Sequence, residues 1–179
     1  MDLKERIESA ASVREASDIV FDEIKRMTGS RYCYVAYVDP ENGDSVGIKF
    51  SHLTEYCRHY EEMGEARFKL PSSGKYGGLL GYSLDTGESF FTNNPAGHPA
   101  AHGIPDGHRK VSKFLSVAVK DSEGILGQIV AGDPPENYDE THLRIAEEIA
   151  GHYAGVLRRF WRGEIPLGDI RERFIRRRP

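Results

Sequence analysis

A chain of 179 residues has the length of one domain, and 39% hydrophobic with 29% charged residues is the composition of a globular protein. No apolar run is long enough to cross a membrane, and the N-terminus lacks the apolar stretch of a signal peptide, so we expect a cytoplasmic protein with no membrane span. The two cysteines, Cys33 and Cys57, form no CxxC motif, which argues against a disulfide framework and predicts reduced thiols.

Charge is distributed unevenly along the chain. Residues 158–179 contain eight arginines and three acidic residues, a net charge of +5, so the rest must carry −9 to give the overall −4. An acidic body argues against a nucleic-acid-binding surface, because phosphate contact requires a basic face. The basic end is interpreted as a solvated tail, or as a contact for nucleic acid, acidic lipid or an acidic partner.

The first predicted element is a helix over residues 3–28 with a joint near Ser12. Apolar residues recur at helical spacing on both sides of the joint, and Ser12 with Glu15 has the spacing of a capping box. Gly29 follows the last apolar position, where a left-handed C-terminal cap is expected.

Two antiparallel hairpins are predicted from β-favouring runs separated by turn residues. The paired segments are residues 32–38 with 46–50 and residues 114–119 with 124–131. A long amphipathic helix then begins at Asp139 and ends before Gly163.

The middle of the chain is less regular. Short helices are predicted at residues 54–63 and 76–84, and short extended segments at residues 68–70 and 89–92. Residues 93–109 contain three prolines, three glycines and three histidines, a composition typical of a loop. We expect this least regular segment to carry function.

This element order predicts an α+β fold with a mostly antiparallel central sheet. The terminal helices pack together on one face, and loops and short helices cover a pocket on the other. We assign residues 1–162 to one domain and residues 163–179 to a basic tail or linker.

Several short segments of the chain occur together in a known order. They are Leu70–Gly74, Thr86–Ser89, Phe91–Pro95, Gly103–His108, Phe114–Val117, and Ile129–Asp133 followed by Tyr138 and Asp139. From about residue 5 to 160, the sequence therefore resembles the GAF domains of bacterial and archaeal signalling proteins.

The resemblance implies a PAS-like sheet, a ligand pocket beneath the middle segment, a homodimer formed through the first and last helices, and binding without catalysis. Two positions depart from the family pattern. Val117-Ala118-Val119 stands where Val-Pro-Val is common, and Asp133 stands where asparagine is common. The ligand type is therefore not carried over, and no cofactor is assigned.

Better-defined relatives provide a test for catalysis and chromophore binding. Free methionine sulfoxide reductases resemble this fold but need cysteines in the middle loops, where this chain has none after Cys57. Bilin-binding GAF domains attach their chromophore to a cysteine in a context that neither Cys33 nor Cys57 has. Residues 137–140 only partly match the signature of cyclic-nucleotide-binding GAF domains. We therefore expect no enzyme activity.

Candidate ligand-binding residues lie in and around the irregular middle segment. They are Tyr76, Phe91, Asn93, Asn94, His98, His102, His108 and Phe114. The aromatic members fit a hydrophobic core as well as a pocket, and the asparagines fit a turn before a proline. The three histidines offer an alternative, a metal or haem ligand set, although the neighbouring prolines and glycines argue against a helix that would align them.

The leading hypothesis is a sensory domain that binds an unidentified small molecule and passes its occupancy to a signalling output partner through the terminal helices. The alternatives are a redox or hydrolytic GAF enzyme and a purely structural dimerisation module. Gly151 and Gly155 give the last helix a small-residue face, which fits either a second chain or packing onto the first helix.

Overall fold

The computed structural model describes residues 1–170. Its helices are α1 (Leu3–Glu8), α2 (Val13–Thr28), α3 (Cys57–Met63), α4 (Gly78–Thr86), the short 3-10 turn η1 (Pro95–Gly97) and α5 (Glu140–Trp161). Its strands are β1 (Tyr32–Val38), β2 (Ser45–Phe50), β3 (Ala66–Phe68), β4 (Phe90–Thr92), β5 (Phe114–Asp121) and β6 (Gly124–Gly132). The predicted elements are all present, with ends that differ by a few residues.

The strands form one antiparallel sheet in the order β3-β2-β1-β6-β5-β4. Each hairpin partner is adjacent in the sheet, and β1 pairs with β6 to join the two hairpins at the centre. The edge strands β3 and β4 have three residues each. The predicted α+β fold is confirmed.

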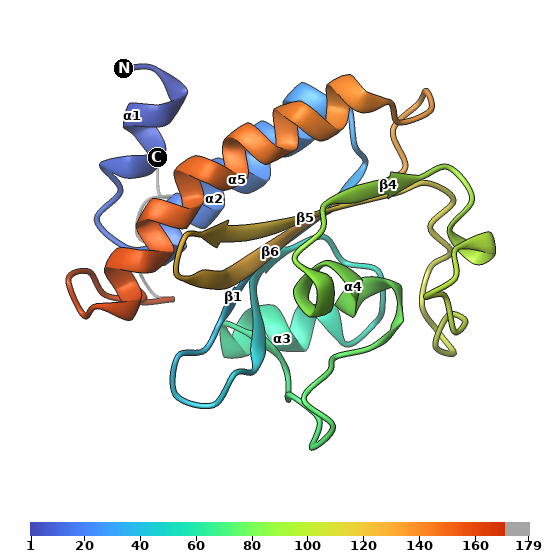
Figure 1. Ribbon diagram of the computed structural model, residues 1–179, viewed down its shortest axis with the longest axis horizontal. Helices are drawn as coiled ribbons and strands as arrows, with labels where there is room; N and C mark the ends of the chain where they lie inside the picture. The colour runs from blue at the N-terminus through green and yellow to red at the C-terminus, as the bar shows by residue number, and fades with distance from the viewer. Residues whose placement is uncertain (171–179) are drawn as a thin grey trace.

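The long helices α2 and α5 lie side by side over one face of the sheet, with α1 beside them (Figure 1). Alternate residues of the central strands, such as Val35, Leu115 and Ile129, point into the core that these helices cover, and all three are fully buried. Within this core the Tyr153 hydroxyl lies 2.7 Å from the Ser17 hydroxyl, which satisfies both polar groups. None of the helices within residues 1–170 has the length and apolar character needed to cross a bilayer.

Local signals explain the helix boundaries. Ser12 caps α2 by accepting from the Glu15 N–H, but the Glu15 carboxylate accepts from the Ala11 N–H, so the expected reciprocal bond of a capping box is shifted by one residue. Gly29 ends α2 in the left-handed region at φ 68°, as predicted. Asp139 caps α5 by accepting from the N–H groups of two first-turn residues.

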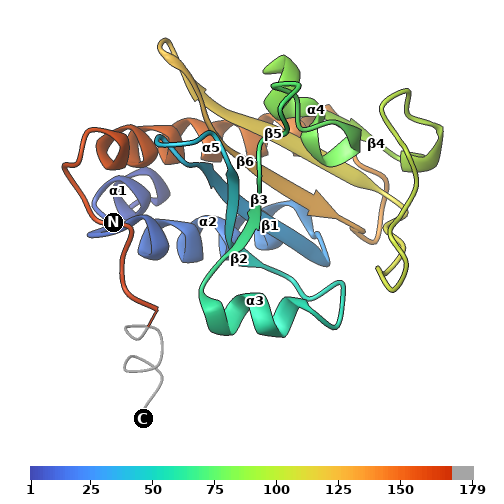
Figure 2. The same cartoon turned by 90° about the horizontal axis from the view of Figure 1, so that it is seen from below.

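The opposite face is covered less completely. Helix α4 packs against β5 and β6, and α3 packs beside β3 (Figure 2). On this face the central strands present small side chains, including Ala36, Gly47 and Ala118. A floor of small residues under one short helix leaves space between the helix and the β3 side of the sheet.

The described part of the predicted tail is docked on the domain. Ile165 is buried, and the carbonyls of Pro166 and Leu167 accept from the N–H groups of Val13 and Arg14 at the start of α2. Residues 163–170 therefore belong to the folded body, and the remaining arginine-rich end, residues 171–179, lies outside the described residues.

Candidate functional site

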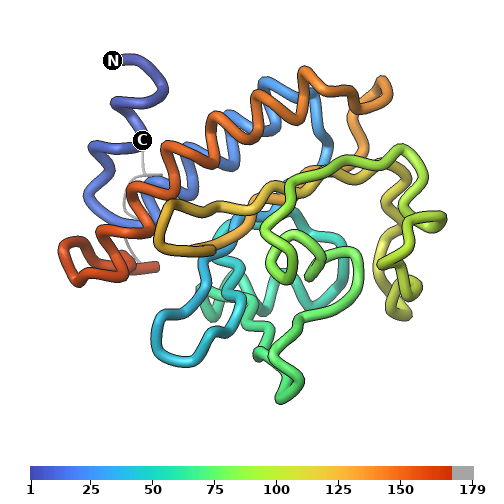
Figure 3. The backbone as a smooth tube through the Cα atoms, in the orientation of Figure 1, coloured from blue at the N-terminus to red at the C-terminus, as the bar shows by residue number. Residues whose placement is uncertain are grey.

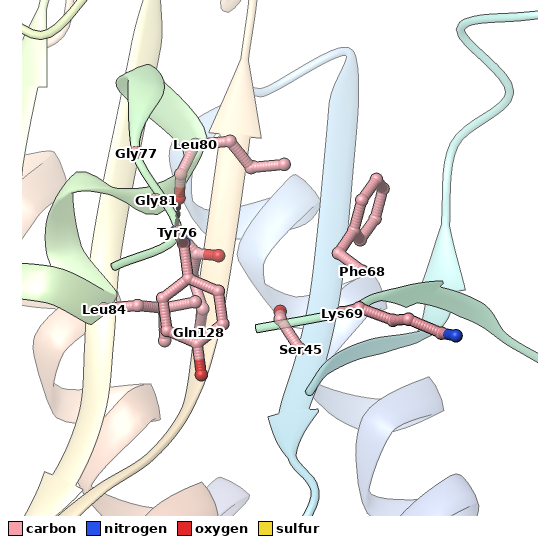
Figure 4. A pocket seen from close by; sticks show the side chains of 9 residues that line it. All are labelled: Ser45, Phe68, Lys69, Tyr76, Gly77, Leu80, Gly81, Leu84 and Gln128. Atoms are coloured by element: carbon pink, nitrogen blue, oxygen red, sulfur yellow. Dashed lines mark hydrogen bonds between the residues drawn. The ribbon is translucent and has the colours of Figure 1, made fainter. Parts of the chain in front are cut away.

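A pocket of about 210 Å³ lies on the sheet face opposite the long helices (Figure 4). Helix α4 and the segment before it form one side, β2 and the end of β3 form the other, and β6 supplies the floor. The lining residues are Ser45, Phe68, Lys69, Tyr76, Gly77, Leu80, Gly81, Leu84 and Gln128. The Lys69 ammonium points away from Gln128, so the inner part of the pocket is uncharged (Figure 4).

Tyr76 is fixed between α4 and the β1–β2 turn. A Cβ on Gly81 would lie 2.7 Å from the Tyr76 Cβ, so glycine at position 81 permits this close packing. The Tyr76 N–H donates to Asp85 Oδ1 over 2.8 Å, and the Tyr76 hydroxyl donates to the Gly43 carbonyl. Burial raises the pKa of Tyr76, so its hydroxyl remains a neutral donor at physiological pH.

Gln128 is the polar residue at the base of the pocket, and its side chain is fully buried. Its two Nε2 N–H groups serve three acceptors: the Leu80 carbonyl, and Ser83 Oγ and Ser116 Oγ, each at 3.0 Å. Its Oε1 is buried without a hydrogen-bond partner. An unpaired buried acceptor costs about 1–3 kcal/mol, so this oxygen favours any bound group that donates to it.

A second buried polar group lies nearby on the same face. The Tyr34 hydroxyl lies close to Ser45 but has no partner of hydrogen-bonding geometry. Its ring packs against Phe50 and Phe68, with the Phe68 centroid 6.4 Å away. Burial raises the pKa of Tyr34 well above its ordinary value, which keeps this hydroxyl protonated.

Only Tyr76 of the eight predicted residues lines this pocket. The irregular segment 93–109 lies beside α4 at the β4 edge of the sheet, away from β1 and β2 (Figure 3). Because α4 stands between this segment and the pocket, the short helix, and not the histidine-bearing loop, covers the hollow.

Two predicted residues belong to an aromatic cluster at the β4 edge. The His98 ring stacks on the Phe90 ring with centroids 4.8 Å apart. The Phe114 centroid lies 5.8 Å from the Phe90 centroid. His98 Nδ1 accepts from the Ala100 N–H. This cluster fastens the loop to the strand.

Phe91 and the two asparagines have packing or turn contacts. Phe91 points to the helix-covered core, because successive strand residues face opposite sides. The Asn93 side chain exchanges two hydrogen bonds with the Tyr138 backbone, at 2.9 and 3.0 Å. Asn94 starts the 3-10 turn and accepts through its carbonyl from the Gly97 N–H.

The remaining two histidines have separate contacts and do not come together with His98. The His102 ring contacts Gly78 at the start of α4, and His108 Nδ1 lies 2.7 Å from the Arg109 carbonyl oxygen. Within residues 1–170, no group of three or more histidine, cysteine or acidic side chains is arranged to hold a metal ion.

Sequence reasoning missed the polar residues that matter most here, Gln128, Ser83 and Ser116. Ser116 interrupts the apolar run 114–119 and Gln128 the apolar run 124–132, and Ser83 lies on the face of α4 that packs onto them. A glutamine in the middle of a buried strand was the available signal, because a buried amide requires partners.

Neither cysteine lines the pocket. Cys33 lies in the helix-covered core, and burial raises the pKa of its thiol, which disfavours the reactive thiolate. Cys57 Sγ lies 3.3 Å from Thr54 Oγ1 at the start of α3.

Comparison with known proteins identifies related chains. A family profile described as GAF domain matches residues 10–158. Over 138 residues the chain is 30% identical to a methyl sulfide methyltransferase-associated sensor from Methanosarcina acetivorans, a match that covers 76% of this chain but 13% of that protein. The chain thus spans a small part of the sensor's length.

Solved structures share the same architecture. The GAF domain of a phosphoenolpyruvate-protein phosphotransferase from Coxiella burnetii has a TM-score of 0.73 at 18% identity, covering 91% of this chain and 93% of that one. The free methionine-R-sulfoxide reductase from Neisseria meningitidis has a TM-score of 0.64 at 14% identity, covering 87% and 84%. At these identities the likeness shows the fold alone.

Proposed function

The chain belongs to the GAF domain family, and from this premise we propose that it is a non-catalytic sensory domain that binds a small molecule in the pocket between α4 and strands β2 and β3. One observation carries the proposal: the buried and unpaired Gln128 Oε1 at the floor of an otherwise apolar pocket. The sensor from Methanosarcina acetivorans supports a role in signalling.

The chemistry of the pocket supports binding without catalysis. Among its lining residues the titratable side chains are Lys69 and Tyr76, and the lining includes no cysteine, histidine or carboxylate. Nucleophilic catalysis needs a nucleophile within hydrogen-bond reach of a base. The reductase alternative would need a cysteine at this place.

A buried arginine provides the route from the pocket to the terminal segments. Arg14, 6% exposed at the start of α2, donates from Nη1 to the Gly64 carbonyl at 2.7 Å and from Nε to the Gly168 carbonyl at 3.0 Å. Gly64 ends α3 just before β3, and β3 carries the pocket residue Phe68. Ligand occupancy that shifts Phe68 is therefore passed through Gly64 and Arg14 to the C-terminal segment, where an output partner reads it.

Homodimer formation is the second part of the proposed output. Gly151 and Gly155 face open space on α5, so they do not serve packing onto α1 or α2. Adjacent exposed glycines let another helix approach closely. Sedimentation of the wild type and of Gly155→Arg measures this: a dimer that the substitution dissociates supports the interface, and a monomeric wild type contradicts it.

A ligand screen tests the proposed function. We expect a member of a panel of small metabolites, which includes uncharged amides, alcohols and phenols as well as amino acids and aromatic acids, to raise the melting temperature of the wild type and to shift NMR resonances of pocket residues. Leu80→Trp should abolish this response, because Leu80 lines the pocket while being partly exposed. Ile104→Trp, a similar change at an exposed loop position, is the matched control. A response that survives Leu80→Trp, or no response at all, contradicts the proposal.

A second experiment tests the route through Arg14. We expect a bound ligand to change hydrogen exchange in residues 165–170 of the wild type and to leave it unchanged in Arg14→Lys, because lysine lacks the two-directional donor fork. Arg31→Lys, at an exposed position, is the control. Equal responses in all three proteins would refute the route without affecting the binding proposal.

A further inference from the structure

We propose that the pocket selects small uncharged molecules whose buried end carries an N–H or O–H donor, because Gln128 presents a fixed and unpaired acceptor at its floor. This inference rests on the proposed function and specifies the ligand class.

The orientation of the Gln128 amide is fixed by its partners. The amide contacts the Leu80 carbonyl, which can only accept, so the group facing it must be the NH₂. A flipped amide would place Oε1 against that carbonyl, so that two acceptors would face each other. The Leu80 carbonyl therefore fixes the position of Oε1, which can only accept.

The serines do not satisfy this oxygen. Ser83 Oγ and Ser116 Oγ lie 2.7 Å apart and bond to each other as well as to Nε2. Figure 4 shows Oε1 turned toward the open side of the pocket, where Ser45 and Phe68 lie. The oxygen is thus buried, unpaired within the protein, and on the side of the amide that faces Ser45 and Phe68.

A fixed acceptor discriminates by chemistry. A carboxylate, or another group with only lone pairs, would place its lone pairs against those of Oε1 and leave both oxygens unsatisfied. A group that donates removes the penalty of the unpaired acceptor. Sites that are built to bond a substrate N–H or O–H reject analogues that lack it.

The remaining walls limit the size and polarity of the molecule. Leu80, Leu84 and Phe68 are apolar, and the Lys69 ammonium points outward. The volume of about 210 Å³ lies below the roughly 300–1,000 Å³ of sites for drug-sized ligands. A compact metabolite fits this space, whereas a tetrapyrrole exceeds it.

Isosteric pairs of probes test the proposal. Benzamide and acetophenone differ by an NH₂ in place of a methyl group, and phenol and fluorobenzene differ by a hydroxyl in place of fluorine. We measure dissociation constants by NMR titration of the pocket resonances, with the Gln128 side-chain carbonyl carbon as a direct reporter. We expect the donor member of each pair to bind about tenfold more tightly and to shift that carbon.

The variant Gln128→Met removes the acceptor with little change of volume. We expect the preference within each pair to fall to about one, and a thermal melt verifies folding. Should this variant not fold, the wild-type ratios decide the proposal alone. Equal affinities within both pairs in the wild type would overturn the donor requirement and leave the proposed function intact. If no probe shifts the pocket resonances at millimolar concentration, the inference fails, and the ligand screen decides the proposed function separately.

Discussion

The two faces of the sheet differ in how completely they are packed. Under α1, α2 and α5 the face is a continuous apolar core, and its buried hydroxyl pairs Ser17–Tyr153 and Ser30–Tyr138 are hydrogen-bonded. Under α4 the face combines small residues, a serine–glutamine network, and the unpaired oxygens of Gln128 and Tyr34. The first arrangement supplies stability, and the second gives up some stability by leaving a hollow and unpaired polar atoms, which under the proposed function receive a ligand.

Two strand glycines test this contrast with the same substitution. A Cβ on Gly127 would lie 2.4 Å from the Ala36 carbonyl oxygen and 2.8 Å from Leu157 Cδ1 on the helix-covered face. A Cβ on Gly47 would lie 2.3 Å from Tyr34 Cε2 on the pocket face, and a side-chain atom can shift more easily than the Ala36 backbone. We expect Gly127→Ala to lower the free energy of unfolding by about 3 kcal/mol and Gly47→Ala by about 1 kcal/mol. Urea denaturation measures both losses, and equal losses would show that the two faces are packed alike.

A substitution of Asn93 tests whether the loop of residues 93–109 takes part in ligand binding. Its side chain forms two hydrogen bonds to the Tyr138 backbone and so joins the end of β4 to the segment before α5. We expect Asn93→Ala to lower the free energy of unfolding by about 1–2 kcal/mol and to leave ligand affinity unchanged. Asn94→Ala is the neighbouring control. A large loss of affinity in Asn93→Ala would restore this residue to the site.

Acid titration addresses an ion pair that ties the β5–β6 hairpin to α5. Arg158 donates from Nε and Nη2 to the Asp121 carboxylate, both at 2.7 Å, and these bonds lower the pKa of Asp121 to about 2. Because the folded pKa lies below the ordinary value of 3.8, the stabilisation is complete above about pH 4 and is lost as the pH falls through 2. We expect Asp121→Asn to lower the melting temperature by about 2–4 °C at pH 6 and by less near pH 2.5. A gap that stays constant between these pH values would contradict the assignment.

The fold was largely predictable because its signals are local and repetitive. The spacing of apolar residues predicted α2 and α5, and turn residues between β-favouring runs predicted both hairpins. Even the departure at Asp133 has a local cause. This residue has φ 52°, a left-handed conformation that asparagine and aspartate tolerate, and its carboxylate accepts from the Ser112 and Lys113 N–H groups.

The site was less predictable because it depends on contacts between distant segments. Tyr76 was identified from the sequence, but Gln128 was not. Gln128 is 45 residues from its partner Ser83 in the chain, and the two meet only because α4 packs over β6. The three histidines of residues 93–109 were conspicuous in composition. Their loop follows the edge strand β4, however, so it lies on the other side of α4 from the pocket. Composition indicates which residues can do chemistry, and topology decides which of them meet.

The short edge strands have a consequence for the behaviour of the protein in concentrated solution. An exposed edge of many residues offers a row of free N–H and C=O groups on which another chain can add a strand. Here both outer strands, β3 and β4, offer only three residues each, and glycine or loop segments turn the chain away immediately beyond them. The sheet therefore presents little template for aggregation through added strands.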